Sequence, residues 1–203
     1  MDEVRALAER LQIPLTDDAA ERLGAFLRLT ALWGKRIDLT SARDNGALAE
    51  ILFVDALHMV SVELVPENAR VLDVGAGVGA PTLPMLLMRP DLRALLVEPR
   101  RKRVAFLRTA VGSLGLAQRV QVVEAKLDLD APRALVDAHG AVDVALARAT
   151  FAPGVWLGLG RQLAPRTLVL TAQEAPPAGA MLSVSYAVPS SGAKRVVSAY
   201  AAQ

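Results

Sequence analysis

A glycine-rich segment that contains Gly75, Gly77 and Gly79 directly follows a short apolar run that contains Asp73. A second apolar run, about 20 residues further on, ends in Glu98. Glycine permits a positive φ and has no Cβ, so the main chain and the N-terminus of a following helix can approach a nucleotide-like ligand closely. The pattern therefore predicts a ligand-binding turn between a buried strand and a helix, with one acid ahead of the turn and one acid at the next strand end.

Two classes of nucleotide cofactor use such a turn. A dinucleotide site has the pattern Gly-x-Gly-x-x-Gly/Ala with an acid about 20 residues later, and the residues that satisfy it are Gly75, Gly77, Ala80 and Glu98. S-adenosylmethionine carries a sulfonium and an amino group, which suit the carboxylate of Asp73, whereas a pyrophosphate would be repelled by it. In either case Glu98 can accept hydrogen bonds from both hydroxyls of an adenosine ribose. Asp73 therefore favours S-adenosylmethionine, and a nicotinamide-dependent oxidoreductase stays open as an alternative.

Composition excludes several other classes of protein. The chain has 203 residues, enough for one sizeable core with an appendage, and 53% of them are hydrophobic, which excludes a disordered protein. With no cysteine and only His58 and His139 as imidazole ligands, neither a disulfide framework nor a metal centre is expected. The charges near Met1 are wrong for a signal peptide, and no uncharged apolar run reaches about 18 residues. We therefore expect a cytoplasmic protein with no membrane partner.

A run of four cations follows the second acid of the turn. Although the net charge is only +2, Arg100, Arg101, Lys102 and Arg103 stand together directly after Glu98-Pro99. In an α/β fold this position lies at the carboxyl edge of the sheet, where ligands bind. Phosphates of a nucleic acid are the natural partner of such a patch. The alternative is that these side chains only form the solvated first turn of a helix.

The order of apolar periods predicts two parts. Residues 1–67 are expected to be a helical segment, with a first helix marked by an apolar stripe over 4–11 and further helices over 17–33 and 46–64. Residues 68–203 are expected to form an α/β domain with a doubly wound, mostly parallel, seven-stranded sheet of the Rossmann-like kind. The strands are expected over 70–75, 92–97, 119–124, 141–147, 166–172, 181–188 and 195–201, and the helices over 82–89, 101–114 and 153–163. The last two strands are expected to form an antiparallel pair.

Several short motifs of this chain occur together in one known family. The most specific is the turn Gly75-x-Gly77-x-Gly79-x-Pro81-x-x-Pro84, because most methyltransferases have the glycines without the two prolines. The others are Leu32-Trp33, Arg36-Ile-Asp-Leu-Thr40, Asp55-Ala-Leu57, Arg89-Pro-Asp91, Lys102-Arg103, Phe106-Leu107 and Ala147-Arg148-Ala149. On these motifs the chain resembles the RsmG family, also called glucose-inhibited division protein B, from about residue 25 to the C-terminus.

The resemblance implies a class I methyltransferase that uses S-adenosylmethionine to methylate N7 of a guanine in small-subunit (16S) ribosomal RNA. The cofactor-binding residues that it implies, together with those of the turn, are Asp73, Gly75, Ala76, Gly77, Glu98, Lys126, Leu127 and Arg148. Arg148, at the end of the fourth strand, is also the candidate catalytic residue because it is expected to engage a base or phosphate of the substrate. Arg100, Arg101, Lys102 and Arg103 are the candidate RNA-binding residues. No metal is implied, and we expect a monomer.

The chain departs from the family pattern mainly on the substrate side. Ile51-Leu52 stands where the family has Arg-His, and the fifth strand ends in Leu170-Thr-Ala-Gln173 where the family has Lys-Gly. Within the turn, Ala80 replaces a phenylalanine and Thr82 a glycine. These losses leave open a second hypothesis, a repurposed or non-catalytic RsmG-like protein that binds cofactor or RNA without methylating ribosomal RNA.

Overall fold

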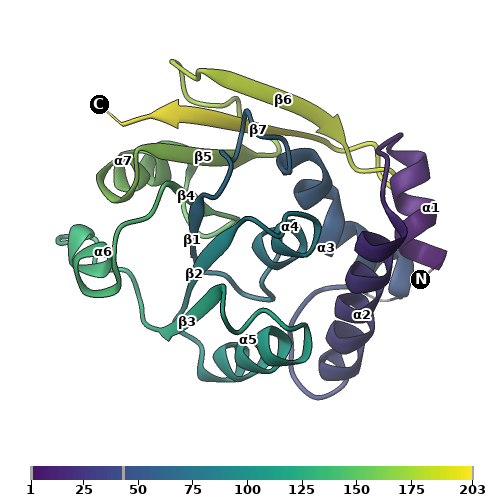
Figure 1. Cartoon of the computed structure of the whole chain (residues 1–203). Helices are drawn as coiled ribbons and strands as arrows, with labels where there is room; N and C mark the ends of the chain where they lie inside the picture. The colour runs from purple at the N-terminus through teal and green to yellow at the C-terminus, as the bar shows by residue number, and fades with distance from the viewer. Residues whose placement is uncertain (1, 43, 203) are drawn as a thin grey trace.

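The computed structural model describes residues 2–42 and 44–202, and its centre is a seven-stranded sheet with helices on both faces (Figure 1). The strands follow the spatial order β3-β2-β1-β4-β5-β7-β6. Their bounds are β1 Arg70–Val74, β2 Arg93–Glu98, β3 Val120–Glu124, β4 Val144–Ala147, β5 Arg166–Thr171, β6 Leu182–Ala187 and β7 Lys194–Ala201. The first five strands pair in parallel, and β7 inserts antiparallel between β5 and β6. The predicted α/β class and the closing antiparallel pair are thereby confirmed.

Seven helices occur among the described residues. Their bounds are α1 Asp2–Arg10, α2 Asp17–Gly34, α3 Asn45–Met59, α4 Thr82–Met88, α5 Arg101–Ser113, α6 Arg133–His139 and α7 Pro153–Leu163. Two hydrophobic clusters separate them into layers: α1 to α5 pack on one face of the sheet, and α6 and α7 pack on the other. The N-terminal helices share the first cluster with the sheet, so the predicted helical segment covers one face of the α/β part. The division at residue 67 itself stays a prediction.

Local capping explains where two of the N-terminal helices begin. The Thr16 hydroxyl accepts a hydrogen bond from the main-chain N–H of Ala19, and the Asp44 carboxylate accepts one from that of Ala47. A side-chain oxygen at this position satisfies an N–H that has no partner within the helix. The start of α2 at Asp17 agrees with the sequence prediction.

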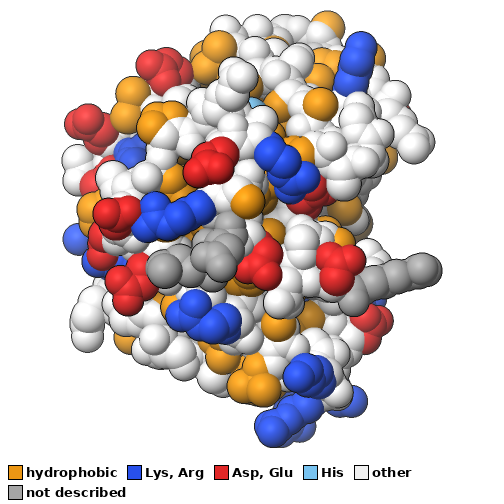
Figure 2. Space-filling view, turned by 90° about the vertical axis from the view of Figure 1, so that its right-hand side faces the viewer, with side chains coloured by type: hydrophobic (Ala, Val, Ile, Leu, Met, Phe, Trp, Pro, Cys, Tyr) orange, Lys and Arg blue, Asp and Glu red, His pale blue; other side chains and the backbone are white. Residues whose placement is uncertain are grey.

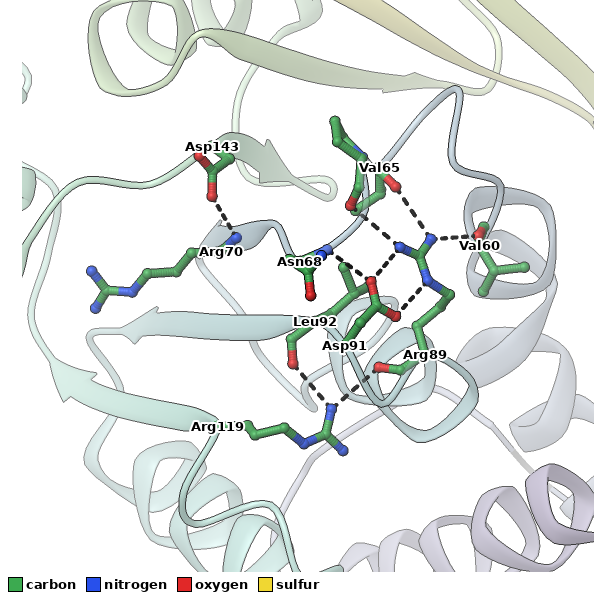
Figure 3. Close-up of polar contacts among 10 residues, drawn as sticks. Val60, Val65, Asn68, Arg70, Arg89, Asp91, Leu92, Arg119 and Asp143 are labelled. Atoms are coloured by element: carbon green, nitrogen blue, oxygen red, sulfur yellow. Dashed lines mark hydrogen bonds and ion pairs between the residues drawn. The ribbon is translucent and has the colours of Figure 1, made fainter.

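Two element predictions were wrong. The third helix was expected to reach Leu64 but ends at Met59, because the guanidinium of Arg89 donates to the main-chain carbonyls of Val60 and Val65 and holds this segment as a turn (Figure 3). The short helix α6 was not predicted at all. It buries only Val136 and spans seven residues, which is too few for a helical apolar period to stand out.

Arginines fasten the amino ends of the parallel strands to neighbouring loops (Figure 3). Arg119 donates to the main-chain carbonyls of Leu86, Arg89 and Leu92, and Arg89 forms a two-armed ion pair with Asp91. The Arg89 guanidinium holds the pKa of Asp91 at about 2. Cations bonded to the last carbonyls of a helix also offset its dipole. This edge of the sheet is therefore closed by side-chain to main-chain bonds.

The outer surface of the N-terminal helices carries acidic and basic side chains interspersed (Figure 2). A face of mixed charge does not produce a strong field of one sign. Among the residues that the structure describes, no helix has the length and apolar character needed to cross a bilayer.

Candidate active site

A cleft of about 660 Å³ opens at the carboxyl ends of the central parallel strands. Its walls include the turn after β1, the segment after β4 and the end of β5, with contributions from α3 and the β6–β7 hairpin. The sheet order reverses between β1 and β4, because β2 lies on the other side of β1. Open α/β sheets bind ligands at such a reversal, in the crevice outside the carboxyl ends of the strands.

The glycine turn forms one wall of this cleft. Gly75, Gly77 and Gly79 have φ values of 76°, 58° and 82°, a region that residues with a Cβ rarely adopt. The main-chain N–H groups of Gly75 and Ala76 both donate to the carbonyl of Val97, at 2.8 and 3.1 Å, which fastens the turn to β2. A Cβ on Gly75 would collide with the side chain of Thr150. Glycine is thus required at position 75 by both conformation and close approach.

Crowding is weaker at Gly77: of the atoms of described residues, the one nearest to an added Cβ would be Arg103 Nη1, at 3.6 Å. Position 77 therefore demands glycine through its φ rather than through crowding. The neighbouring main chain lies open along the cleft, as a ligand held by a glycine turn requires. The peptide bond between Ala80 and Pro81, just beyond, is cis.

Glu98 lies beneath the turn with its side chain buried. One carboxylate oxygen accepts a hydrogen bond from the N–H of Gly77 and the other accepts one from the N–H of Arg100, both at 2.9 Å. Glu98 thereby joins the glycine turn to the start of α5. Each oxygen keeps a second lone pair, so acceptance of a ribose hydroxyl is compatible with these bonds. Ribose binding by Glu98 stays a prediction.

Asp73 is fully buried behind the turn. Its Oδ2 accepts a hydrogen bond of 2.7 Å from the hydroxyl of Thr82, while Oδ1 has no hydrogen-bond partner among the described residues. Burial, together with the charge of Glu98, raises the pKa of Asp73 to about 7, although Thr82 and Arg148 act in the opposite direction. A buried carboxylate oxygen without a partner is costly. A cationic group bound near the turn would lower that cost.

Arg148 directly follows β4 and lies on the opposite side of the cleft from α5. Its Nη1 donates to the carbonyl of Ile51 at 2.7 Å and to Asp55 Oδ2 at 3.1 Å. The next residue, Ala149, has a φ of 55°, which is unfavourable for alanine and turns the chain sharply along the cleft. The structure thus brings Arg148 into the same cleft as Gly75 and Gly77.

The basic run divides into two groups. Arg103 lines the cleft next to Gly77, whereas Arg100, Arg101 and Lys102 are exposed beside it. The two residues predicted from the segment after β3 lie outside the cleft lining: Lys126 is exposed, and Leu127 is buried in the cluster under α6 and α7. Of the predicted site residues, the cleft therefore collects Gly75, Ala76, Gly77, Arg103 and Arg148.

Among the cleft residues that were not predicted as part of the site, Asp55, Tyr186 and Arg195 form one hydrogen-bonded group. Asp55 of α3 accepts hydrogen bonds from Arg195 and Tyr186 in the β6–β7 hairpin as well as from Arg148. The partners of Asp55 lie 93 to 140 residues away in sequence. The only sequence signal was the position of Asp55 within a motif of the resembled family.

Residues 19–157 match the family described as rRNA small subunit methyltransferase G. A protein named ribosomal RNA small subunit methyltransferase G from Halorhodospira halophila is 37% identical over 148 residues, which cover 72% of this chain and 67% of that protein. One of the same name from Anaeromyxobacter sp. is 32% identical over 159 residues, 76% of this chain and 69% of that protein. A third, from Desulforamulus reducens, is 31% identical over 113 residues and is covered for 47% of its length.

Solved structures share the fold at low sequence identity. The C-terminal domain of precorrin-6Y C5,15-methyltransferase from Rhodobacter capsulatus superposes with a TM-score of 0.52 at 19% identity, covering 80% of this chain and 93% of that one. TrmN from Thermus thermophilus gives a TM-score of 0.51 at 21% identity, covering 70% of this chain and 47% of that one. At these identities the likeness concerns the fold alone.

Proposed function

The chain belongs to the rRNA small subunit methyltransferase G family, and from this premise we propose that it transfers a methyl group from S-adenosylmethionine to N7 of a guanine in small-subunit ribosomal RNA. The observation that carries the proposal is the joint position of the glycine turn and Arg148 on one cleft, at the point where the strand order reverses. A turn alone would suit several cofactors. A turn that faces an arginine across a cleft also provides a place for an anionic substrate.

The residues at the turn fit S-adenosylmethionine better than a dinucleotide. Asp73 Oδ1, which has no hydrogen-bond partner in the described part of the chain, suits a ligand that carries a sulfonium and an amino group, and it would oppose a pyrophosphate. The open main chain along Gly77 leaves room for the nucleoside, and Glu98 stands at the end of β2 for its ribose. In this assignment Gly75, Ala76 and Gly77 supply main chain, and Asp73 and Glu98 supply carboxylates. Lys126 and Leu127 remain proposed neighbours of the adenine.

Methylation at guanine N7 requires little acid–base catalysis by the protein. S-adenosylmethionine supplies a methyl group on a positively charged sulfur, which leaves as a neutral thioether. N7 attacks with an in-plane lone pair that bears no proton, so the base becomes cationic and no general base is needed. Catalysis then rests on holding the nucleophile and the methyl donor in line. Arg148 positions the substrate, and Arg100, Arg101, Lys102 and Arg103 attract the RNA backbone.

Methyl transfer to ribosomal subunits tests the proposal directly. Small subunits from a strain that lacks the N7 mark are incubated with the protein and radiolabelled S-adenosylmethionine, and the rRNA is then digested and its nucleosides are identified by mass spectrometry. We expect 7-methylguanosine at up to one methyl group per subunit. Subunits that already carry the mark are the matched control and should take up none. Absence of 7-methylguanosine from the unmarked subunits, under conditions where the cofactor binds, would reject the proposal.

That rejection would favour the second candidate, a family member that binds cofactor or RNA without methylating ribosomal RNA. The observation behind it is that Ile51 contributes only its main-chain carbonyl to Arg148, where the resembled family places a cation. NADH binding in the same cleft would instead revive the oxidoreductase alternative.

A further inference from the structure

One buried carboxylate connects three separate parts of the cleft wall. Asp55, on α3, accepts a hydrogen bond from Arg148 Nη1 on Oδ2 at 3.1 Å. Its Oδ1 accepts one from Arg195 Nη1 at 2.7 Å and one from the hydroxyl of Tyr186 at 3.0 Å. The side chain of Asp55 is only 2% exposed. Asp55 therefore fixes the end of β4 and the β6–β7 hairpin relative to each other.

The charges of Asp55, Arg148 and Arg195 do not cancel. Although burial raises it, the pKa of Asp55 is held below its ordinary value by the charges of Arg148 and Arg195 and by their hydrogen bonds. The carboxylate is thus ionised at neutral pH and compensates one of the two guanidinium groups. The group of Asp55, Arg148 and Arg195 keeps a net charge of about +1, since arginine is effectively always protonated.

Both guanidinium groups retain donors toward the cleft. The side chain of Arg148 is 22% exposed and that of Arg195 is 31% exposed, and both line the cleft. Among the described residues, each of these arginines makes its side-chain bonds through Nη1. A guanidinium has five N–H donors in a planar fork. The remaining donors are oriented by a fixed carboxylate and are available to an anionic ligand.

Arg195 lies farther from the glycine turn than Arg148 does. Its strand, β7, lies three strands from β1 in the sheet order, which at about 4.8 Å per strand is roughly 14 Å. Arg148 directly follows β4, the strand that pairs with β1. The arginine pair therefore extends from the edge of the turn into the half of the cleft farther from it, where a substrate would lie.

We propose that Arg148 and Arg195, spaced by Asp55, form a two-arginine site that binds one phosphate of the substrate RNA. This inference rests on the proposed function and names Arg195 as a second substrate-binding residue, contributed by the C-terminal hairpin. Two guanidinium forks match the oxygens of a phosphate in the way that makes arginine preferred for its recognition. Asp55 and Tyr186 act through the arginines and are positioning residues.

The first test is the salt dependence of RNA binding by Arg195→Gln. Affinity for unmarked small-subunit rRNA is measured at several salt concentrations, and affinity for S-adenosylmethionine is measured by calorimetry. We expect RNA affinity to fall about tenfold and the slope of log affinity against log salt to decrease by about 0.7 to 1, the value for one lost phosphate contact. Cofactor affinity should stay within about twofold. Arg93→Gln, at an exposed position on the opposite edge, removes the same charge and should change neither.

Two results would overturn the inference. An unchanged salt slope would mean that Arg195 contacts no phosphate, and a loss of cofactor affinity would assign the pair to the cofactor instead. Should Arg195→Gln fail to fold, Arg195→Lys keeps the charge but loses the fork. It should retain the salt slope while lowering kcat, and an unchanged kcat would count against the two-fork site. The RNA slope is measured without methyl transfer, so it tests this inference even if the proposed function fails.

Asp55→Asn separates positioning from simple stabilisation. The substitution keeps the shape of the side chain but raises the net charge of the group, so RNA affinity should be kept or strengthened while kcat falls about tenfold. A residue with only a structural role would lower the fraction of folded protein, and kcat per folded molecule would not change. A kcat that is normal once corrected for folded protein would contradict the positioning role.

Discussion

At the amino ends of the strands, Arg70, Arg119 and Arg166 donate to main-chain carbonyls, whereas at the carboxyl ends Arg148 and Arg195 share one carboxylate and line a cleft. The two edges of the sheet use arginine for different purposes. Where the guanidinium donors are taken up by carbonyls of loops and helix ends, the arginine holds the chain together. Where a single buried acid orients the guanidinium and other donors face a cleft, the arginine is prepared for a ligand.

The comparison predicts that the arginines at the amino ends of the strands contribute more to stability than those at the cleft. Arg89→Ala would leave Asp91 without its cation and would remove donors from the carbonyls of Val60, Val65 and Pro66. Because the ion pair is partly buried and several hydrogen bonds are lost with it, we expect a loss of about 2 to 4 kcal/mol in the free energy of unfolding, measured by urea denaturation. Cofactor affinity of the protein that remains folded should not change. Arg93→Ala, an exposed arginine on the same edge, should change stability by less than about 0.5 kcal/mol.

At the cleft edge, replacing an arginine should slow methyl transfer strongly and lower stability only slightly. Arg148→Ala leaves Asp55 with Arg195 and Tyr186, so the free energy of unfolding should fall by only about 1 to 2 kcal/mol. Methyl transfer in single-turnover assays should slow about 100-fold, because the substrate loses its positioning group. If Arg148→Ala were as unstable as Arg89→Ala and methylated at the normal rate per folded molecule, the distinction between the two edges would not hold.

A smaller effect concerns pH and Asp73. Because burial raises the pKa of Asp73 to about 7 from 3.8, the folded protein retains a proton that the unfolded chain releases. The contribution of Asp73 to stability is therefore present below about pH 4 and is lost as the pH rises toward about 7. If a cation of the cofactor meets the ionised form, cofactor affinity should rise up to about tenfold per pH unit below pH 7 and then level off.

Calorimetric titration with S-adenosylmethionine between about pH 5.5 and 7.5 measures this dependence. Asp73→Asn has no proton to lose and should bind weakly, with little change over the same range. A wild-type affinity that is equally flat would mean that Asp73 does not meet the cationic part of the ligand.

The sequence predicted the turn and the sheet well because their signals are local. Short apolar runs, glycines at alternate positions and the acids Asp73 and Glu98 lie within about 30 residues, and each strand was placed within a few residues of its observed bounds. The helix α6 was missed because it buries a single apolar residue. The end of α3 was missed because a distant guanidinium, that of Arg89, binds the carbonyls of Val60 and Val65 on either side of the segment expected to continue the helix.

The substrate half of the site was less accessible to sequence reasoning. In the sequence Asp55 stood out only as part of a family motif, and nothing local pointed to its partners Arg148, Arg195 and Tyr186. This arrangement depends on β7 entering the sheet between β5 and β6, which places Arg195 opposite Tyr186 and near the end of β4. The order of the strands in the sheet cannot be read from the local periodicity of apolar residues. The group could be found only once the strands were arranged in space.

The most direct test of the account is a calorimetric titration of S-adenosylmethionine into the wild type, Gly77→Val and Gly115→Val. Gly77 and Gly115 have φ values of 58° and 68°, and neither would place a Cβ within 3.5 Å of any other residue that the structure describes, so valine imposes similar backbone strain at both positions. Gly77 lies in the cleft, whereas Gly115 precedes β3 at the opposite edge. The account predicts binding by the wild type and by Gly115→Val, and none by Gly77→Val. Absence of binding by the wild type, or equal binding by all three proteins, would contradict the assignment of the glycine turn as the cofactor site.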